Sequence, residues 1–151
     1  LAQLSPDEFA EISKPFVQKA GHELPANLTE ITASIQEKTR LLTDVPPAIS
    51  FLLDSDFDYD PVSLDKVRNN ESAKNLLSEL ALNFDQVNNW TMAKEVISET
   101  AKANGAKPGQ LMFPTRVALS GQSGGPDLGA ILDILGKDES IRRVQRTIEQ
   151  L

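Results

Sequence analysis

The stretch TRVALSGQSGGPDLGAILDILG, residues 115–136, places a glycine-rich loop between two apolar segments. A strand, a glycine loop and a helix in this order form the usual phosphate-binding site. A Walker-type loop needs a lysine after its last glycine, and GQSGGP contains none. A dinucleotide-binding loop needs a βαβ unit, which the neighbouring segments do not supply. The loop therefore either simply joins two helices or offers the free N–H groups of a helix N-terminus to a phosphate or a base.

Helical periodicity extends over almost the whole chain. The first segment opens with a capping box at Ser5 and Glu8, and Pro15 is expected to kink it. Capping residues and glycines delimit the expected helices, which cover residues 6–20, 27–42, 44–54, 70–84, 88–105, 126–136 and 138–151. No β pattern recurs, so the chain is predicted to be all-α. A boundary in the acidic segment divides it into two small helical subdomains, residues 1–60 and 61–151.

Composition excludes several classes of protein. The 15 Lys and Arg residues against 22 Asp and Glu residues give a net charge of −7, so a nucleic acid must be bound by a local site rather than by general attraction. The chain has no cysteine and one histidine, His22, which is expected to have a surface or capping role. No apolar run is long enough to span a bilayer, and LAQLSPDEF does not resemble a signal sequence. A cytoplasmic location is the expectation.

The acidic segment DSDFDYD, residues 54–60, resembles part of a calcium-binding loop in the spacing of its aspartates. It lacks the central glycine and the closing glutamate of such a loop. A solvated acidic turn is therefore the favoured interpretation.

Three stretches of the chain match the pattern of a known family. The run AKPGQLMFPTRVALSGQSGGPDLGAILDILGKDESIRRVQRTI, residues 106–148, resembles the C-terminal end of bacterial glutamyl-tRNA synthetases, with the markers P-x-R-x-A-L-[TS]-G, G-P-x-L and L-L-G-K-[ED]. LSPDEFAEISKPFVQKAG, residues 4–21, resembles the start of that family's helical region. IQEKTRLLTDVPPAISFLLD, residues 35–54, resembles its E-R-x-x-T-L-x-E helix pair. The likeness covers the whole chain and is weakest over residues 54–85.

The resemblance implies the α-helical cage that binds the anticodon in a class I aminoacyl-tRNA synthetase. That family activates glutamate with ATP and Mg²⁺ in a Rossmann-type domain with His-Ile-Gly-His-like and Lys-Met-Ser-Lys-Ser-like signatures, and neither signature occurs here. The chain is therefore expected to be a fragment, without a cofactor of its own and inactive without an upstream catalytic domain of the same polypeptide. The implied partner is tRNA(Glu), with tRNA(Gln) left open, and the chain is expected to be a monomer.

The resemblance also implies which residues read the anticodon. The family's contacts correspond to Arg116 and to Gly125, Pro126 and Leu128 of the glycine loop and the following helix. A guanidinium can hydrogen-bond a base edge and also pack against a base, which suits Arg116. An ion pair of Arg116 with a neighbouring aspartate remains the alternative, and for Leu128 the alternative is burial in the apolar stripe of its helix.

Lys38 occupies the place where the family often has an arginine that reads the third anticodon base and favours tRNA(Glu) over tRNA(Gln). This sequence departs from the family pattern here, because a lysine lacks the planar fork of donors with which an arginine bonds a base edge. The alternative is a lysine at the edge of an apolar stripe with its amine in solvent. Arg142, Arg143 and Arg146 are candidates for contacts with the RNA backbone, and a solvated basic face is their alternative.

Two other functional classes remain open. A helical module that binds protein but no RNA would also suit the acidic net charge. A small independent enzyme is disfavoured, because no pair of acid and base and no set of metal ligands emerges from the sequence.

Overall fold

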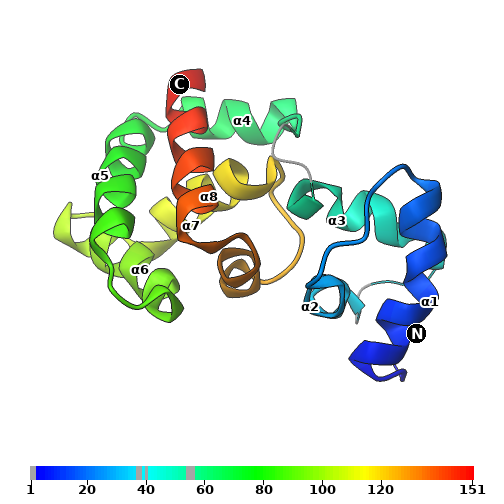
Figure 1. Cartoon of the computed structure of the whole chain (residues 1–151). Helices are drawn as coiled ribbons and strands as arrows, with labels where there is room; N and C mark the ends of the chain where they lie inside the picture. Colours follow the sequence, from blue (N-terminus) through cyan, green and yellow to red (C-terminus); the bar gives the residue numbers. More distant parts are fainter. Residues whose placement is uncertain (1–2, 37–38, 40, 54–56) are drawn as a thin grey trace. The chain divides into compact units, whose positions relative to one another are not determined.

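The computed structural model describes residues 3–36, 39, 41–53 and 57–151, and within these ranges the chain forms helices and no strands (Figure 1). The predicted all-α class is confirmed. The α-helices are α1 (Pro6–Lys19), α2 (Leu28–Ala33), α3 (Val45–Leu53), α4 (Pro61–Arg68), α5 (Ala73–Gln86), α6 (Ala93–Ala103), α7 (Pro108–Ser120) and α8 (Leu128–Gln150). Two short 3₁₀ helices are η2 (Leu42–Asp44) and η3 (Trp90–Met92). None of the described helices combines the length and apolar character of a membrane span.

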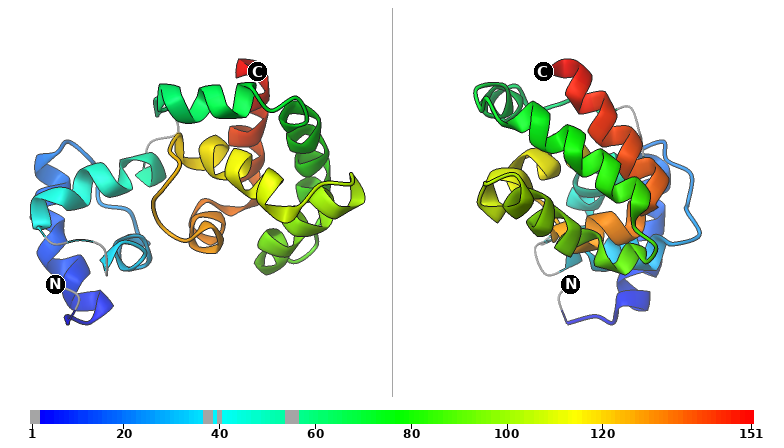
Figure 2. Two further views of the ribbon diagram at one scale, coloured as in Figure 1. Left: turned by 180° about the vertical axis from the view of Figure 1, so that it is seen from behind. Right: turned by 90° about the vertical axis from the view of Figure 1, so that its left-hand side faces the viewer.

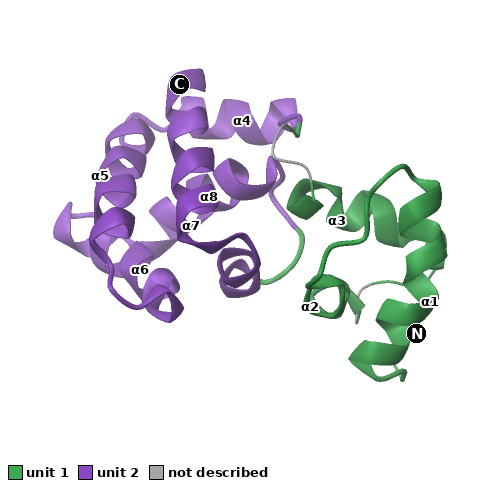
Figure 3. Ribbon diagram, in the orientation of Figure 1, with its two compact units in different colours: residues 1–57, 125–127 green, residues 58–124, 128–151 purple. Residues whose placement is uncertain are grey.

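The chain divides into two compact units (Figure 3). Unit 1 consists of Leu1–Phe57 together with Gly125–Asp127, and unit 2 consists of Asp58–Gly124 together with Leu128–Leu151. The sequence-based division was 1–60 and 61–151. The two divisions differ by the short segment before α4 and by the three residues of the glycine loop that group with unit 1.

Unit 1 is built from α1, α2 and α3, which pack on one another. The predicted capping box is present: the Ser5 hydroxyl accepts from the Glu8 N–H at 3.2 Å, and the Glu8 carboxylate accepts from the Ser5 N–H at 3.2 Å. Phe9, Val17 and Ile49 are fully buried in the core of this unit.

The helix predicted over 27–42 is shorter in the structure, because α2 ends at Ala33. The backbone hydrogen bonds change at this point: the Ser34 N–H still bonds the Glu30 carbonyl, whereas the Ile35 N–H bonds the Thr32 carbonyl, one residue nearer. The Thr32 hydroxyl donates to the Leu28 carbonyl at 2.9 Å and the Ser34 hydroxyl to the Ile31 carbonyl at 2.5 Å. Hydroxyl bonds of this kind also occur inside α1 and α5, which continue past them, so they accompany the end of α2 without accounting for it.

Unit 2 has α5 at its centre, in contact with α6, α7 and α8. Figure 2 shows α5 and the C-terminal part of α8 running side by side. The apolar faces of these helices interlock to form the core of the unit. Its fully buried large side chains are Leu76, Leu77, Leu80, Phe84, Ile97, Leu111, Leu119 and Ile131.

Two helices of unit 2 were not predicted as separate elements. α4 is short, with Asp60 as its N-cap and Pro61 in its first turn, and its inward face is carried mainly by Leu64 and Val67. α7 contains Pro114 and is buried on several sides, so its apolar residues do not follow one helical face. Periodicity could therefore not identify either helix.

The predicted stop near residue 136 corresponds to a break within α8. Gly136 has φ 77° and ψ 173°. Residues other than glycine rarely adopt a backbone conformation with such a positive φ. The Trp90 indole N–H donates to the Leu132 carbonyl at 2.7 Å in the turn before the break, and the Trp90 ring lies edge-on to Phe84. α8 is thus two helical segments, the first close to η3 and the second leading to the C-terminus.

Candidate nucleic-acid interface

Arg116 lies near the end of α7, one turn before the last residue of the helix, Ser120, and is half-buried. The Arg116 carbonyl accepts from the Ser120 hydroxyl at 2.8 Å. Gly121 then ends the helix in the left-handed conformation, with φ 74°, and its N–H bonds to the Val117 carbonyl at 2.7 Å. The turn that carries Arg116 is therefore closed by its own helix-end contacts.

The other predicted base contacts lie in two units. Gly125 is exposed, Pro126 is buried, and both group with unit 1, whereas Arg116 and Leu128 belong to unit 2. Leu128 begins α8 and is 4% exposed. It is a core residue of unit 2, which is the alternative that the sequence left open for it.

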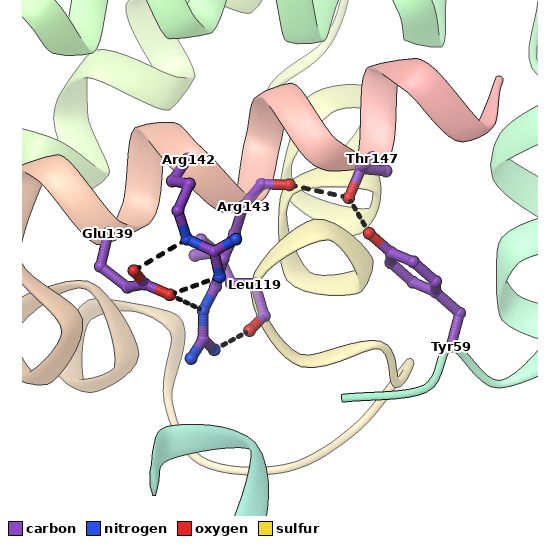
Figure 4. Close-up of polar contacts among 6 residues, drawn as sticks. All are labelled: Tyr59, Leu119, Glu139, Arg142, Arg143 and Thr147. Atoms are coloured by element: carbon purple, nitrogen blue, oxygen red, sulfur yellow. Dashed lines mark hydrogen bonds and ion pairs between the residues drawn. The ribbon is translucent and has the colours of Figure 1, made fainter. Parts of the chain in front are cut away.

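Arg143 is buried, with only 1% of the residue exposed. Its Nη1 donates to the Leu119 carbonyl on α7 at 2.7 Å, and its Nε donates to Glu139 Oε1 at 2.9 Å (Figure 4). The guanidinium of Arg143 is thus enclosed within the fold, where the expected contact with the RNA backbone would need it exposed. A buried guanidinium keeps its charge and needs such partners.

Glu139 accepts hydrogen bonds from two arginines. Both of its carboxylate oxygens bond Arg142, at 3.0 Å to Nε and 2.9 Å to Nη2, in addition to the bond from Arg143 (Figure 4). The hydrogen bonds from Arg142 lower the pKa of Glu139 more than its partial burial raises it, and Arg143 lowers it further. Burial lowers the pKa of Arg143, against the effect of the Glu139 hydrogen bond. Glu139 is thus a carboxylate that stays ionised at neutral pH.

Arg142 and Arg146 lie one helical turn apart on α8. The Arg142 side chain is 43% exposed, so its guanidinium is open to solvent even while it contacts Glu139. Arg146 is half-buried and stacks over the ring of Tyr59, with its central carbon 4.8 Å from the ring centroid. Of the three arginines of the predicted basic cluster, Arg142 is therefore exposed, Arg146 is half-buried and Arg143 is enclosed.

Tyr59 was not singled out from the sequence, where it lies within the acidic segment. Its hydroxyl is 2.8 Å from the Thr147 hydroxyl, which in turn donates to the Arg143 carbonyl at 3.0 Å (Figure 4). Glu139 was also missed, although its spacing to Arg142 and Arg143 is the spacing of helical ion pairs.

The acidic segment contributes a helix cap. Asp60 accepts from the Ser63 N–H at 3.1 Å and the Ser63 hydroxyl at 2.6 Å. The hydrogen bond from the Ser63 hydroxyl, followed by that from its N–H, lowers the pKa of Asp60. Asp54, Asp56 and the predicted third-base reader Lys38 lie outside the described residues. Within the described ranges, no three side chains of the metal-binding types gather in one place.

The sequence of this chain matches a known protein family and proteins of known name. The anticodon binding domain family matches residues 8–148. A glutamate–tRNA ligase of Akkermansia muciniphila is 39% identical over 144 residues, which are 94% of this chain and 32% of that protein. A glutamate–tRNA ligase of Thermus thermophilus is 33% identical over 149 residues, covering 96% of this chain and 31% of that protein.

The fold is also found in a solved structure. The crystal structure of a glutamate tRNA ligase from Elizabethkingia meningosepticum in complex with its amino acid superimposes with a TM-score of 0.86 at 23% identity, over 98% of this chain and 30% of that one. The chain belongs to the anticodon binding domain family, in the form that these glutamate–tRNA ligases carry. It spans about a third of the length of the curated relatives it matches.

Proposed function

We propose that this chain recognises the anticodon of tRNA(Glu) as part of a glutamate–tRNA ligase. The observation that carries the proposal is the family match over residues 8–148, together with relatives named glutamate–tRNA ligase that align along nearly the whole chain. The catalytic domain, with its ATP and Mg²⁺, lies in another part of the same polypeptide under this proposal, and the described chain supplies no step of the chemistry. Under this proposal the protein is located in the cytoplasm, where translation occurs. It binds tRNA as a monomer.

Arg116 is the residue that we assign to base reading. It is half-buried at the end of α7, where its turn is closed by the Ser120 and Gly121 contacts. These contacts hold the backbone of the turn, so the position from which the Arg116 guanidinium reaches the edge of a splayed base is fixed. Gly125 is exposed and has φ 131°, so it is the residue of the glycine loop whose backbone can approach RNA, and the buried Pro126 fixes the chain directly after it.

Arg142 and Arg146 are assigned to the phosphate backbone. Arg142 is exposed, and the fork of donors with which it bonds Glu139 also suits a phosphate, which would share or replace this carboxylate when RNA binds. Because the net charge is −7, general attraction of RNA is weak and these local arginines must supply the backbone contacts. Lys38 is assigned to the choice between tRNA(Glu) and tRNA(Gln).

The proposal is tested by measuring the affinity of this chain for two RNA stem–loops that differ only in the anticodon. One carries the tRNA(Glu) anticodon and the other has its anticodon bases replaced. We expect tighter binding of the first at every salt concentration, since base-edge contacts are insensitive to salt compared with phosphate contacts. Equal affinities for the two stem–loops would contradict the assignment of anticodon recognition.

A further inference from the structure

The guanidinium of Arg143 occupies an unusual place for a charged group. Arg143 is 1% exposed and is the bulkiest of the fully buried side chains among the described residues. Burial of a charge costs free energy that an apolar side chain of the same size would not cost. The hydrogen bonds of Arg143 to Glu139 and to the Leu119 carbonyl offset this cost.

Arg143 holds the end of α7. The last carbonyls of a helix have no donor within that helix, and Leu119 lies in the final turn, one residue before the end of α7. Arg143 Nη1 supplies a donor at 2.7 Å. Glu139 accepts from Arg143 Nε at 2.9 Å and so orients the guanidinium towards that carbonyl (Figure 4).

Further contacts secure the same turn from the segment before α4, all within unit 2. The Asp60 N–H donates to the Gly121 carbonyl at 2.7 Å, directly after the end of α7. The neighbouring Tyr59 hydroxyl contacts Thr147, whose own hydroxyl bonds the Arg143 carbonyl. The end of α7 is thus tied both to α8 and to the chain that leads into α4.

We propose that Arg143, oriented by Glu139, is a positioning residue for anticodon recognition: by holding the Leu119 carbonyl it fixes the turn of α7 that carries Arg116. Arg116 lies one turn before Leu119, and its carbonyl bonds the Ser120 side chain next to Leu119. Hydrogen bonds to a base edge are directional, so a small shift of this turn weakens them. The inference rests on the proposed role of Arg116 and assigns to the buried pair a function in specificity as well as stability.

The test compares Arg143→Met, Arg116→Ala and the double variant, with Trp90→Phe as the matched control. Trp90→Phe also removes one side-chain donor from a backbone carbonyl, that of Leu132, and it does so in the first part of α8. For each variant, affinity is measured for the tRNA(Glu) anticodon stem–loop and for the stem–loop with replaced anticodon bases. The ratio of the two affinities measures anticodon specificity separately from overall binding.

We expect Arg116→Ala to lower this ratio by about 5- to 150-fold, which is the usual range for a lost base contact. Arg143→Met should lower the ratio towards that of Arg116→Ala, and should lower it no further when Arg116 is already alanine. Arg143→Lys keeps a cationic donor but cannot bond Leu119 and Glu139 through a planar fork, so its ratio should be intermediate. Trp90→Phe should leave the ratio unchanged.

Several results would overturn the inference. Equal losses of affinity for both stem–loops in Arg143→Met would reduce Arg143 to a structural residue, as would an additive effect in the double variant. An equal fall of the ratio in Trp90→Phe would do the same. If Arg143→Met does not fold, the test uses Arg143→Lys instead. An Arg143→Lys variant that folds and keeps the wild-type ratio of the two affinities contradicts the inference. A wild-type chain with no anticodon preference overturns the proposed function itself, which distinguishes the two failures.

Discussion

The Nη1 atom of Arg143 lies 2.7 Å from the carbonyl oxygen of Leu119, a residue that is 24 positions earlier in the chain. This hydrogen bond joins α8 to the end of α7, which are the two helices on either side of the glycine loop. The glycine loop therefore begins at the end of α7, and a hydrogen bond from α8, in the same unit, holds that end in place. Arg116 lies one turn before Leu119 on the same helix, so the held end of α7 fixes the backbone next to it.

Replacing Arg143 with methionine is predicted to destabilise the fold. The Leu119 carbonyl would lose its Arg143 donor in a buried environment, which costs about 1–3 kcal/mol in the free energy of unfolding. Arg142→Met is the matched control, since its side chain is 43% exposed and an exposed ion pair contributes only about 0.2–1 kcal/mol. Urea unfolding followed by circular dichroism measures both. Equal losses in the two variants would show that the Leu119 contact contributes nothing beyond a surface pair.

Stability should depend on pH through Glu139. The hydrogen bonds from Arg142 and Arg143 hold the pKa of Glu139 in the folded chain below its ordinary value of 4.5. The ionised carboxylate therefore stabilises the fold above pH 4.5, and this contribution is lost as the pH falls through the lowered pKa. The free energy of unfolding should accordingly fall more steeply on acidification in the wild type than in Glu139→Gln. The lowered pKa of Asp60 acts equally in both proteins, so parallel curves would refute the role of Glu139.

The Trp90 indole offers a test of the break in α8. Trp90→Phe keeps a ring beside Phe84 and removes the N–H that bonds the Leu132 carbonyl at 2.7 Å. We expect a loss of about 0.5–1.5 kcal/mol in the free energy of unfolding, the net value of an ordinary hydrogen bond. Urea unfolding followed by circular dichroism measures it, because the substitution removes the only tryptophan. No loss of stability would mean that the turn before Gly136 does not depend on η3.

Lys38→Arg should increase the preference for the tRNA(Glu) anticodon over the tRNA(Gln) anticodon. The two anticodons are presented as matched stem–loops, and the ratio of their affinities is compared between the wild type and the variant. The planar guanidinium can bond a base edge with two donors, whereas the amine of lysine is a single point of charge. An unchanged ratio would assign Lys38 to a solvent-facing role.

The sequence predicted the fold where one helical face is apolar and the helix ends are marked. The capping box at Ser5 and Glu8 and the glycine at 136 identified α1 and the break in α8. It failed for α7, which is buried on several sides and contains Pro114. It also made α2 too long, because helical apolar spacing continues past Ala33, where the backbone hydrogen bonds of the α-helix stop.

The candidate site was only partly predictable for a different reason. A run of arginines near the C-terminus indicates positive charge, but it does not distinguish the inward side of the helix from the outward side. Arg143 turned out to be buried while Arg142 is exposed, since adjacent residues on a helix point about 100° apart. The helical ion-pair spacing to Glu139 was visible in the sequence, whereas the bond to Leu119 depends on tertiary packing.

The central claim is that Arg116 reads a base, whereas Arg142 contacts only the backbone. It is tested by measuring affinity against salt concentration for the wild type, Arg116→Ala and Arg142→Ala, each on the tRNA(Glu) stem–loop and on the stem–loop with replaced anticodon bases. Arg116→Ala should weaken binding of the first RNA by about 1–3 kcal/mol and leave the second nearly unchanged. Arg142→Ala should weaken both alike and reduce the salt slope by about 0.7. If Arg116→Ala weakens both RNAs equally, with the same change of slope as Arg142→Ala, then Arg116 does not read the anticodon and the account is wrong.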